Sequence, residues 1–300
     1  MLTKKKTATK RKNTTRKIPP FEKLPKKRGS RIFSMETYKI NCGKNKLYDY
    51  KSPEETSMDK NDFVHLVLSK LQDYDKPVVV KVYDTNSLQL LLEKKILEKI
   101  RGYRNIARLI CEFSCDDNKN NYITKLTRQI KFYERETNKL YFFVYEYIAH
   151  GDISDYLKKT QDIKIVKTLI LQMVCVIIEL ATIYKVWRSY LNSGNILIDK
   201  TDEKNIEYKI GDEVVVIESN GIIPKIIDFG RCKFYNQHII DNYVWHDIIM
   251  AISLIEIYAN NDEVKQLFSK NKNPYELSLP SIKDYYFYVR DTLYPSGDDM

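Results

Sequence analysis

The chain of 300 residues corresponds by length to about two domains, and 43% of its residues are hydrophobic. This apolar content is sufficient for a core, which excludes a wholly disordered or fibrous chain. Nine Gly and nine Pro are too few for a collagen-like or linker-like sequence. The formal net charge is +10, and its distribution along the chain is uneven.

The positive charge is concentrated in an N-terminal arm, residues 1–31. This arm has 13 Lys and Arg against one acid, Glu22 (net +12), whereas the rest has 37 basic and 39 acidic residues (net −2). The arm has too few apolar residues to offset its ordering entropy, so we expect it to be disordered. A tether to nucleic acid or an acidic surface, a nuclear-import signal and a solubilising tail are the open alternatives.

The five cysteines form no CxxC pair and there are only four histidines, which argues against a disulfide framework or a structural zinc site. The arm lacks the apolar segment of a secretory signal, so we expect an intracellular, reduced protein. The most apolar stretch, residues 168–184, is interrupted by Gln172 and Glu179 and is short for a bilayer span. We expect a buried helix there and no membrane segment.

The first half of the chain is predicted to be rich in strands. Residues 32–57 are a polar extension without a clear pattern. The predicted elements that follow are strands at 63–68 and 77–83, a helix at 88–100 with apolar positions at 88, 91, 92, 96, 97 and 100, strands at 106–113 and 140–147, and a polar loop at 116–139.

The second half, after Gly151, is predicted to be mainly helical. Its predicted elements are a long helix at 163–184, strands at 196–198 and 225–227 with a hairpin at 207–217 between them, and a helix at 243–258. A β-rich part followed by a helical part is typical of an α+β chain with two lobes.

Three short pieces of sequence contain residue types that phosphoryl transfer requires. Lys81 lies in a Val-rich strand, Asn195 in Gly-Asn-Ile-Leu-Ile, and Asp228 in Ile-Ile-Asp-Phe-Gly. A Lys can contact phosphates, and Asn and Asp oxygens can bind Mg²⁺. In this order and spacing the pieces resemble the protein kinase superfamily, from about residue 59 to residue 258.

The resemblance implies an α+β, protein-kinase-like two-lobe fold. It places a small β-rich lobe at 58–148 and an abbreviated helical lobe at 149–300, after the arm and the extension at 32–57. Glu93 matches the helix Glu that pairs with the strand Lys, here Lys81, and the two count with Tyr190 as the catalytic positions. ATP and Mg²⁺ are the implied cofactors.

Further residues match the nucleotide-binding positions of the family. Tyr145 falls at the gatekeeper position, and the segment implied to face the adenine consists of Glu146, Tyr147 and Ile148. Asp152 matches an acid that often meets the ribose, although it could equally cap a helix.

Two other matches concern the metal and the catalytic loop. Asn195 and Asp228 match the Mg²⁺ ligands of the family. Asp247 resembles the helix Asp that braces the catalytic loop, which is a structural role.

The sequence departs from the family at the catalytic loop. The family has an Asp five residues before the loop Asn, whereas this chain has Tyr190, and no acid lies between Glu179 and Asp199. A phenol with a pKa near 10 is a poor base at pH 7.

Two further departures affect the phosphate and substrate regions. The glycines of the phosphate-covering loop are replaced by Asp59, Asn61 and Val64, which should weaken ATP binding. Asp247 lies only 19 positions after Asp228, and no Ala-Pro-Glu occurs, so the platform for a peptide substrate is short.

These observations lead to the expectation of a serine/threonine-type kinase-like protein that is a pseudokinase or a very weak kinase. An active atypical phosphotransferase is one alternative, because the electrostatic contribution of Lys81 and Mg²⁺ does not need the base. The hairpin before Asp-Phe-Gly and the run Trp-His-Asp-Ile-Ile resemble kinase-like proteins of large eukaryotic DNA viruses, iridoviruses and giant viruses among them.

This second resemblance implies a viral protein in the host cytoplasm or nucleus, or in the virion. A further alternative is therefore a structural or nucleic-acid-associated viral protein that acts through residues 1–31. The partner could be an unknown protein, or a nucleic acid or acidic surface bound by the arm, and no membrane is expected.

Overall fold

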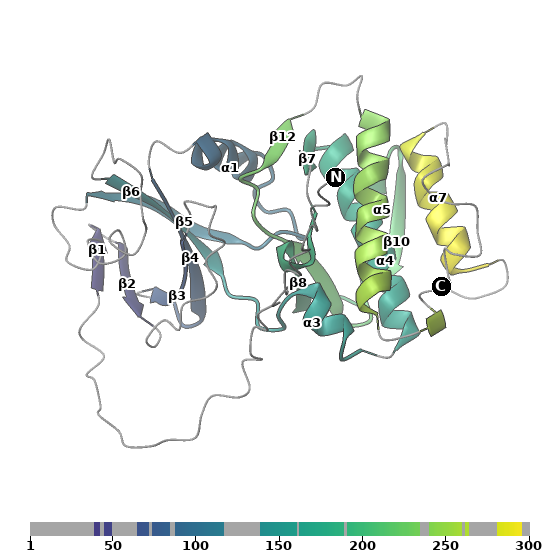
Figure 1. Cartoon of the computed structure of the whole chain (residues 1–300), viewed down its shortest axis with the longest axis horizontal. Helices are drawn as coiled ribbons and strands as arrows, with labels where there is room; N and C mark the ends of the chain where they lie inside the picture. Colours follow the sequence, from purple (N-terminus) through teal and green to yellow (C-terminus); the bar gives the residue numbers. More distant parts are fainter. Residues whose placement is uncertain are drawn as a thin grey trace, which may run out of the picture. The chain divides into compact units, whose positions relative to one another are not determined.

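The computed structural model divides the chain into two units, Met1–Thr37 and Tyr38–Met300 (Figure 1). The structure describes residues 39–42, 45–49, 65–71, 74–84, 88–116, 139–160, 162–188, 191–234, 240–259, 262–263 and 281–295. The basic arm, and with it the expectation of disorder, lies outside these residues. The described residues form five α-helices and four antiparallel sheets, so the expected α+β class is confirmed.

The largest sheet has six antiparallel strands in the order β1-β2-β3-β4-β6-β5. These strands are β1 (Lys39–Cys42), β2 (Asn45–Asp49), β3 (His65–Leu71), β4 (Pro77–Asp84), β5 (Leu109–Asp116) and β6 (Lys139–Glu146). Because side chains alternate along a strand, Val78, Val80 and Val82 pack on one face of β4. Lys81 and Tyr83 consequently lie on the opposite face.

Helix α1 (Leu88–Lys99) follows β4, as expected, but with a different buried face. The sequence pattern placed Leu88 and Leu91 toward the core, whereas these two side chains are 79% and 52% exposed. The first half of the helix buries Leu90 and Glu93 instead, whereas the expected apolar positions 96, 97 and 100 are buried as the pattern indicated. Glu93 faces inward because it pairs with Lys81 on β4, and this polar contact sets the rotation of the helix.

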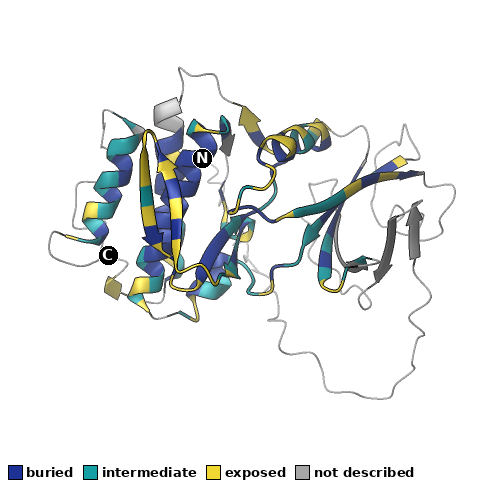
Figure 2. Ribbon diagram, turned by 180° about the vertical axis from the view of Figure 1, so that it is seen from behind, coloured by how far each residue is buried: buried dark blue, intermediate teal, exposed yellow. Residues whose placement is uncertain are grey.

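The helical part is organised around α4 (Ile163–Thr182), with α3 (Ile153–Leu157), α5 (Ile240–Tyr258) and α7 (Ile282–Leu293). Helix α5 packs against α7 through Trp245 and Tyr285, whose rings stack with centroids 4.1 Å apart. Most of α4 is buried, and Figure 2 maps burial over the described part of the chain.

Helix α4 is longer than the apolar stretch noted in the sequence. Among the described residues it is the one helix long and apolar enough to cross a membrane, but 83% of its most apolar window is buried inside the protein. Its residues belong to the main hydrophobic core, together with those of α5 and α7. Packing within the protein therefore accounts for its apolar character.

Three two-stranded sheets complete the described fold. They are β7 (Val186–Arg188) with β12 (Cys232–Phe234), β8 (Ile196–Lys200) with β11 (Ile222–Ile226), and β9 (Asn205–Ile210) with β10 (Glu213–Glu218). The last pair is the expected hairpin, and a short 3-10 helix, η2 (Ser193–Asn195), precedes β8.

Several expectations from the sequence need correction. The strand expected at 106–113 begins only at Leu109, because Ile106 forms a separate parallel bridge with Ile226 of β11. Residues 117–138 of the expected polar loop lie outside the described residues. Cys115 is in a disulfide bond, so the expectation of a fully reduced chain is wrong at this residue, while Cys111, Cys175 and Cys232 are free thiols.

Candidate functional site

A buried ion pair joins β4 to α1. The Nζ atom of Lys81 lies 2.8 Å from Oε2 and 3.1 Å from Oε1 of Glu93. Glu93 is completely buried and Lys81 is 6% exposed. The two residues are 12 positions apart, with the β4–α1 connection between them, and the pair implied by the family resemblance is present.

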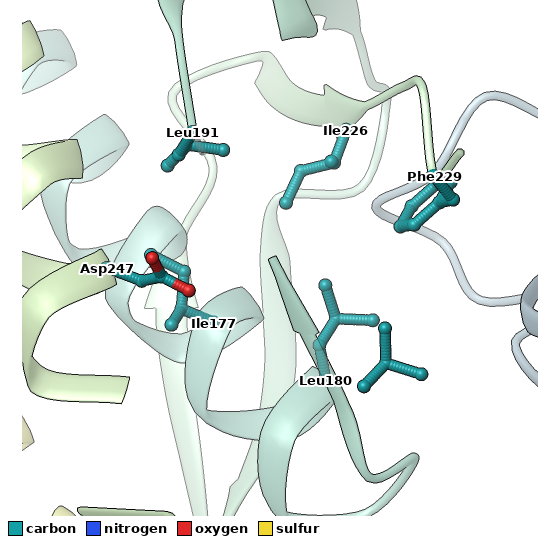
Figure 3. A pocket seen from close by; sticks show the side chains of 7 residues that line it. Ile177, Leu180, Leu191, Ile226, Phe229 and Asp247 are labelled. Carbon is teal, nitrogen blue, oxygen red and sulfur yellow. The ribbon is translucent and has the colours of Figure 1, made fainter. Parts of the chain in front are cut away.

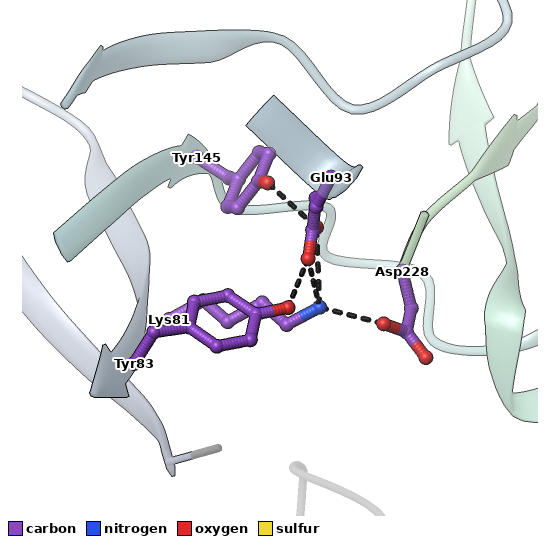
Figure 4. Close-up of polar contacts among 5 residues, drawn as sticks. All are labelled: Lys81, Tyr83, Glu93, Tyr145 and Asp228. Carbon is purple, nitrogen blue, oxygen red and sulfur yellow. Dashed lines mark hydrogen bonds and ion pairs between the residues drawn. The ribbon is translucent and has the colours of Figure 1, made fainter. Parts of the chain in front are cut away.

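Asp228 joins the same cluster from a distant part of the sequence. Its Oδ1 atom lies 2.6 Å from Nζ of Lys81, although the two residues are 147 positions apart (Figure 4). The Asp228 side chain is 38% exposed, so it reaches both the buried lysine and solvent. Its backbone φ of +62° is in the left-handed region, which Asp tolerates better than most residues and which is found more often at functional sites.

The electrostatics of the cluster favour a charged lysine. Burial alone would lower the pKa of Lys81, but attraction to Glu93 and Asp228 and the hydrogen bonds to both raise it above the ordinary value of 10.5. One cation therefore faces two carboxylates, and these three groups together carry one excess negative charge. Such a site attracts a further cation more readily than an anion.

Two tyrosines that the sequence analysis did not connect to the pair also contact Glu93. Tyr83 donates its hydroxyl to Oε2 of Glu93, and Tyr145 donates to Oε1 at 3.0 Å. Burial and the nearby Glu93 carboxylate raise the pKa of both phenols, so both are neutral donors at pH 7. Period-two alternation from Lys81 to Tyr83 was the signal that could have placed Tyr83 here.

Asn195 and Asp228 flank the same end of the antiparallel β8–β11 pair, whose two strands are separated in the chain by the β9–β10 hairpin. Ile196 pairs with Ile226 at the end of this antiparallel ladder, and the N–H of Ile227 donates to the carbonyl of Asn195 at 3.0 Å. Asn195 directly precedes one strand and Asp228 closely follows the other. The half-buried Asn195 and Asp228 are therefore brought to the same end of this strand pair.

The segment expected to face the adenine begins at the end of β6. The Glu146 side chain accepts from the backbone N–H of Arg108 at 2.9 Å, and Nζ of Lys225 lies 3.6 Å from the same carboxylate oxygen. Glu146 thus ties β6 to β11 through its side chain, which leaves a ligand role to the backbone of this segment. Tyr147 is half-buried and Ile148 is buried.

Asp152 has a capping role in the structure. Its Oδ1 atom accepts from the N–H of Asp155 at 2.9 Å and from the hydroxyl of Ser154 at 2.6 Å, which caps the N-terminus of α3. The helix-cap alternative noted for this residue is therefore present.

Asp247 is buried on α5 and faces a small cavity of about 20 Å³ that has room for one water molecule (Figure 3). The cavity is otherwise lined by apolar side chains, those of Ile177, Leu180, Val186, Leu191, Ile226 and Phe229. This apolar enclosure fits a structural role for Asp247. Tyr190 and the positions of the phosphate-covering loop (Asp59, Asn61 and Val64) lie outside the described residues.

No group of three or more His, Cys, Asp or Glu side chains forms a cage for a metal in the described part of the chain. A site of the Asn195–Asp228 type would have two protein oxygen ligands. Comparison of the chain with models of protein families and with curated protein sequences finds no match.

Proposed function

We propose that this chain is a kinase-like, ATP-binding protein with a two-lobe fold that acts as a pseudokinase. One observation supports the proposal most strongly: Lys81, Glu93 and Asp228 come from three separate segments and meet in a single ion cluster, in which Lys81 and Glu93 are buried and Asp228 is partly exposed. A chance match of three short motifs would not require their side chains to touch. In the kinase superfamily this constellation holds the phosphates and the metal of ATP.

The chemistry of the donors fits both proposed ligands. Lys81 supplies the cation for phosphate oxygens, and the segment after β6 offers backbone groups to a base. Asp228 and Asn195 offer a carboxylate and an amide oxygen, which suit Mg²⁺ because this ion keeps several waters and commonly takes only one or two protein carboxylates. When bound, Mg²⁺ would neutralise phosphate charge and the excess negative charge of the cluster.

The sequence of the catalytic loop is the reason to propose binding in place of catalysis. Tyr190 replaces the residue that accepts the substrate proton in active members, and no acid lies nearby in the sequence. A missing base lowers the rate by about 10² to 10⁴-fold, while Lys81 and the metal ligands still support nucleotide binding. Binding of a nucleic acid or an acidic surface by residues 1–31, and a viral origin of the protein, are separate proposals that this site does not address.

A thermal-shift titration with ATP, with and without Mg²⁺, tests the proposal. Binding at 100 times Kd should add about 2.7 kcal/mol, which for a domain of this size raises Tm by roughly 5 to 10 °C. Lys81→Met and Asp228→Asn should remove the Mg²⁺-dependent part of this rise. Asn is chosen at position 228 because it tolerates the left-handed backbone conformation, whereas Ala would add strain.

The matched control is Asp199→Asn, an Asp on β8 of the same strand pair whose carboxylate accepts from the neighbouring backbone N–H of Lys200. This variant should shift with ATP as the wild type does. No rise at millimolar ATP would refute nucleotide binding. Phosphate transfer that disappears in Asp228→Asn and increases in Tyr190→Asp would replace the pseudokinase with an active phosphotransferase.

A further inference from the structure

We infer that Tyr83 and Tyr145 are positioning residues that hold Lys81 in place for phosphate by fixing Glu93. The inference rests on the proposed nucleotide site and identifies the groups that prepare it. We call Tyr83, Glu93 and Tyr145 the tyrosine clamp. Both hydroxyls donate to the Glu93 carboxylate and not to the Lys81 ammonium (Figure 4). The centroid of the Tyr83 ring also lies 5.1 Å from Nζ of Lys81, but Tyr83→Phe keeps this ring contact, so loss of the hydroxyl acts through the carboxylate.

The clamp follows from the register of the sheet. Tyr83 lies two residues after Lys81 on β4, and Tyr145 on β6 is paired with Val79. Residues 79, 81 and 83 share one face of β4, and Tyr145 shares that face because paired residues point the same way. Two hydroxyls therefore converge on α1 from neighbouring strands.

The two hydroxyls bind different oxygens of the same carboxylate. Tyr83 donates to Oε2 and Tyr145 to Oε1, and Lys81 contacts both oxygens. Hydrogen bonds to an ionised group are stronger than those between neutral groups. With both oxygens engaged, the Glu93 carboxylate cannot rotate about its terminal bond without losing a partner.

This restraint matters because Lys81 is shared between two acids. In the structure its ammonium lies 2.8 Å from Glu93 and 2.6 Å from Asp228. A cation bound by Asp228 would compete with Lys81 for that carboxylate, so Glu93 would become the main anchor of the lysine. Because the Glu93 side chain is already ordered, the free energy of nucleotide binding does not include the entropic cost of ordering it.

The surroundings of Tyr83 show how little space the clamp has. Tyr83 is 1% exposed, and a methyl group on Gly230 would lie 3.2 Å from its hydroxyl and 3.4 Å from Oε2 of Glu93. The Tyr83 hydroxyl thus fills the space between Glu93 and the glycine of Asp-Phe-Gly. The clamp is packed against the segment that carries Asp228.

The clamp makes a prediction that simple packing does not. Loss of a hydroxyl should weaken ligands that need Lys81, which are those with phosphates, and leave a ligand without phosphates unaffected. ATP with Mg²⁺ and adenosine are the two probes. We expect Tyr83→Phe and Tyr145→Phe each to weaken ATP–Mg²⁺ by about tenfold, as for loss of one hydrogen bond to a charged group, and adenosine by less than about twofold.

The first measurement needs no ligand. Tm is measured for each Tyr→Phe variant alone and in a Glu93→Gln background, with Tyr141→Phe as the control. Tyr141 lies on the same face of β6, but its hydroxyl accepts from Lys94. We expect the Tm decrease from Tyr83→Phe or Tyr145→Phe to shrink in the Glu93→Gln background, and the decrease from Tyr141→Phe to stay the same.

The second measurement, by calorimetry, is the ratio of the Kd for ATP–Mg²⁺ to the Kd for adenosine in the same variants. A change in this ratio confined to Tyr83→Phe and Tyr145→Phe supports the inference. Equal losses for ATP and adenosine, or Tm decreases that do not depend on Glu93, would overturn it. If the wild type binds no ATP, the proposed function and the nucleotide part of the inference both fail, whereas the Tm cycle still shows whether the tyrosines hold Glu93.

Discussion

Two buried glutamates in this protein have similar surroundings but different partners. Glu93 accepts from two tyrosines and a lysine, whereas Glu179 on α4 accepts from the hydroxyl of Tyr103 at 2.7 Å and the backbone N–H of Lys209 at 2.6 Å. These donors come from the turn segment after α1 and from strand β9, and neither is an ionised group. Glu93 alone shares its lysine with a half-exposed acid, Asp228.

The comparison separates a structural carboxylate from one that prepares a site. A tyrosine hydroxyl and a backbone amide can satisfy the hydrogen-bonding oxygens of a buried carboxylate, and such a carboxylate then has a structural role. A lysine held between two acids retains a partner that a ligand can displace. Burial and a tyrosine partner alone therefore do not identify a functional glutamate, and the shared cation does.

The largest effect is expected from removing the shared cation. Lys81→Met leaves the buried Glu93 without its ion-pair partner and should lower the free energy of unfolding by about 3 kcal/mol. Urea unfolding measures this change. Lys94→Met, on the exposed side of α1, should cost less than about 1 kcal/mol because its ion pair with Glu112 is solvated, and equal costs for the two variants would refute the importance of the Lys81 pair.

The contribution of the Lys81 ion pair to the free energy of unfolding should decrease at high pH. Because the folded-state pKa of Lys81 is raised above 10.5, its stabilising effect is complete below that pH and is lost as pH rises through the folded-state pKa. The stability difference between wild type and Lys81→Met should be constant from about pH 7 to 10 and narrow above 10.5. Unfolding curves at pH 8 and pH 11 compare the two, and a difference that widens would contradict the ion pair.

Removing the structural glutamate should cost stability without affecting nucleotide binding. Glu179→Leu leaves two partly buried donors, the Tyr103 hydroxyl and the Lys209 N–H, without their acceptor, which should cost about 2 to 3 kcal/mol. The milder Glu179→Gln keeps one acceptor and should cost about 1 kcal/mol. If either variant that remains folded loses the thermal response to ATP, the distinction between the two glutamates is wrong.

A smaller effect is expected from a methyl group at the edge of the clamp. Gly230→Ala brings a Cβ atom to 3.2 Å from the Tyr83 hydroxyl, and the buried ring has little room to move, so a loss of about 1 to 2 kcal/mol is expected. Gly194→Ala is the matched control, since its nearest neighbour would lie at 3.5 Å. Thermal melts of both variants show whether the close approach matters, and equal melting points would argue that it does not.

The smallest effect separates the two roles of Asp152. Asp152→Ala removes the cap of α3 and should cost about 1 kcal/mol, and Asp152→Ser should restore most of it because Ser also caps. Since capping already engages Oδ1 of Asp152, we expect both variants to bind adenosine with the affinity of the wild type. A loss of adenosine affinity in Asp152→Ser would instead assign the carboxylate to the ribose.

Much of the fold could be predicted because the strongest patterns are local. The Val-rich strand at 77–83, the helix after it and the long apolar helix were all placed correctly within a few residues. Helix α7 was missed, since its tyrosine-rich sequence suggests strand by propensity, although Ser281 caps it and Tyr285 and Val289 face the core.

The site was harder to predict because it depends on contacts between elements. The pair of Lys81 with Glu93 could be expected from a motif. The burial of Glu93 and the exposure of Leu91 could not be predicted, because a hydrophobic pattern assigns leucine to the core before glutamate. Tyr145 reaches Glu93 only through the pairing of β4 with β6, which a single sequence does not reveal.

The hydrogen bond from Ile227 to Asn195 has a consequence for motion within the site. It extends the β8–β11 ladder by one hydrogen bond beyond Ile196 and Ile226, so Asn195 and Asp228 would move together as a single body. The contact of Lys81 with Asp228, in contrast, connects two different sheets and would lengthen first if those sheets rotated apart. Opening of the proposed site would therefore release the phosphate-binding lysine while the two oxygen ligands for a cation stayed paired.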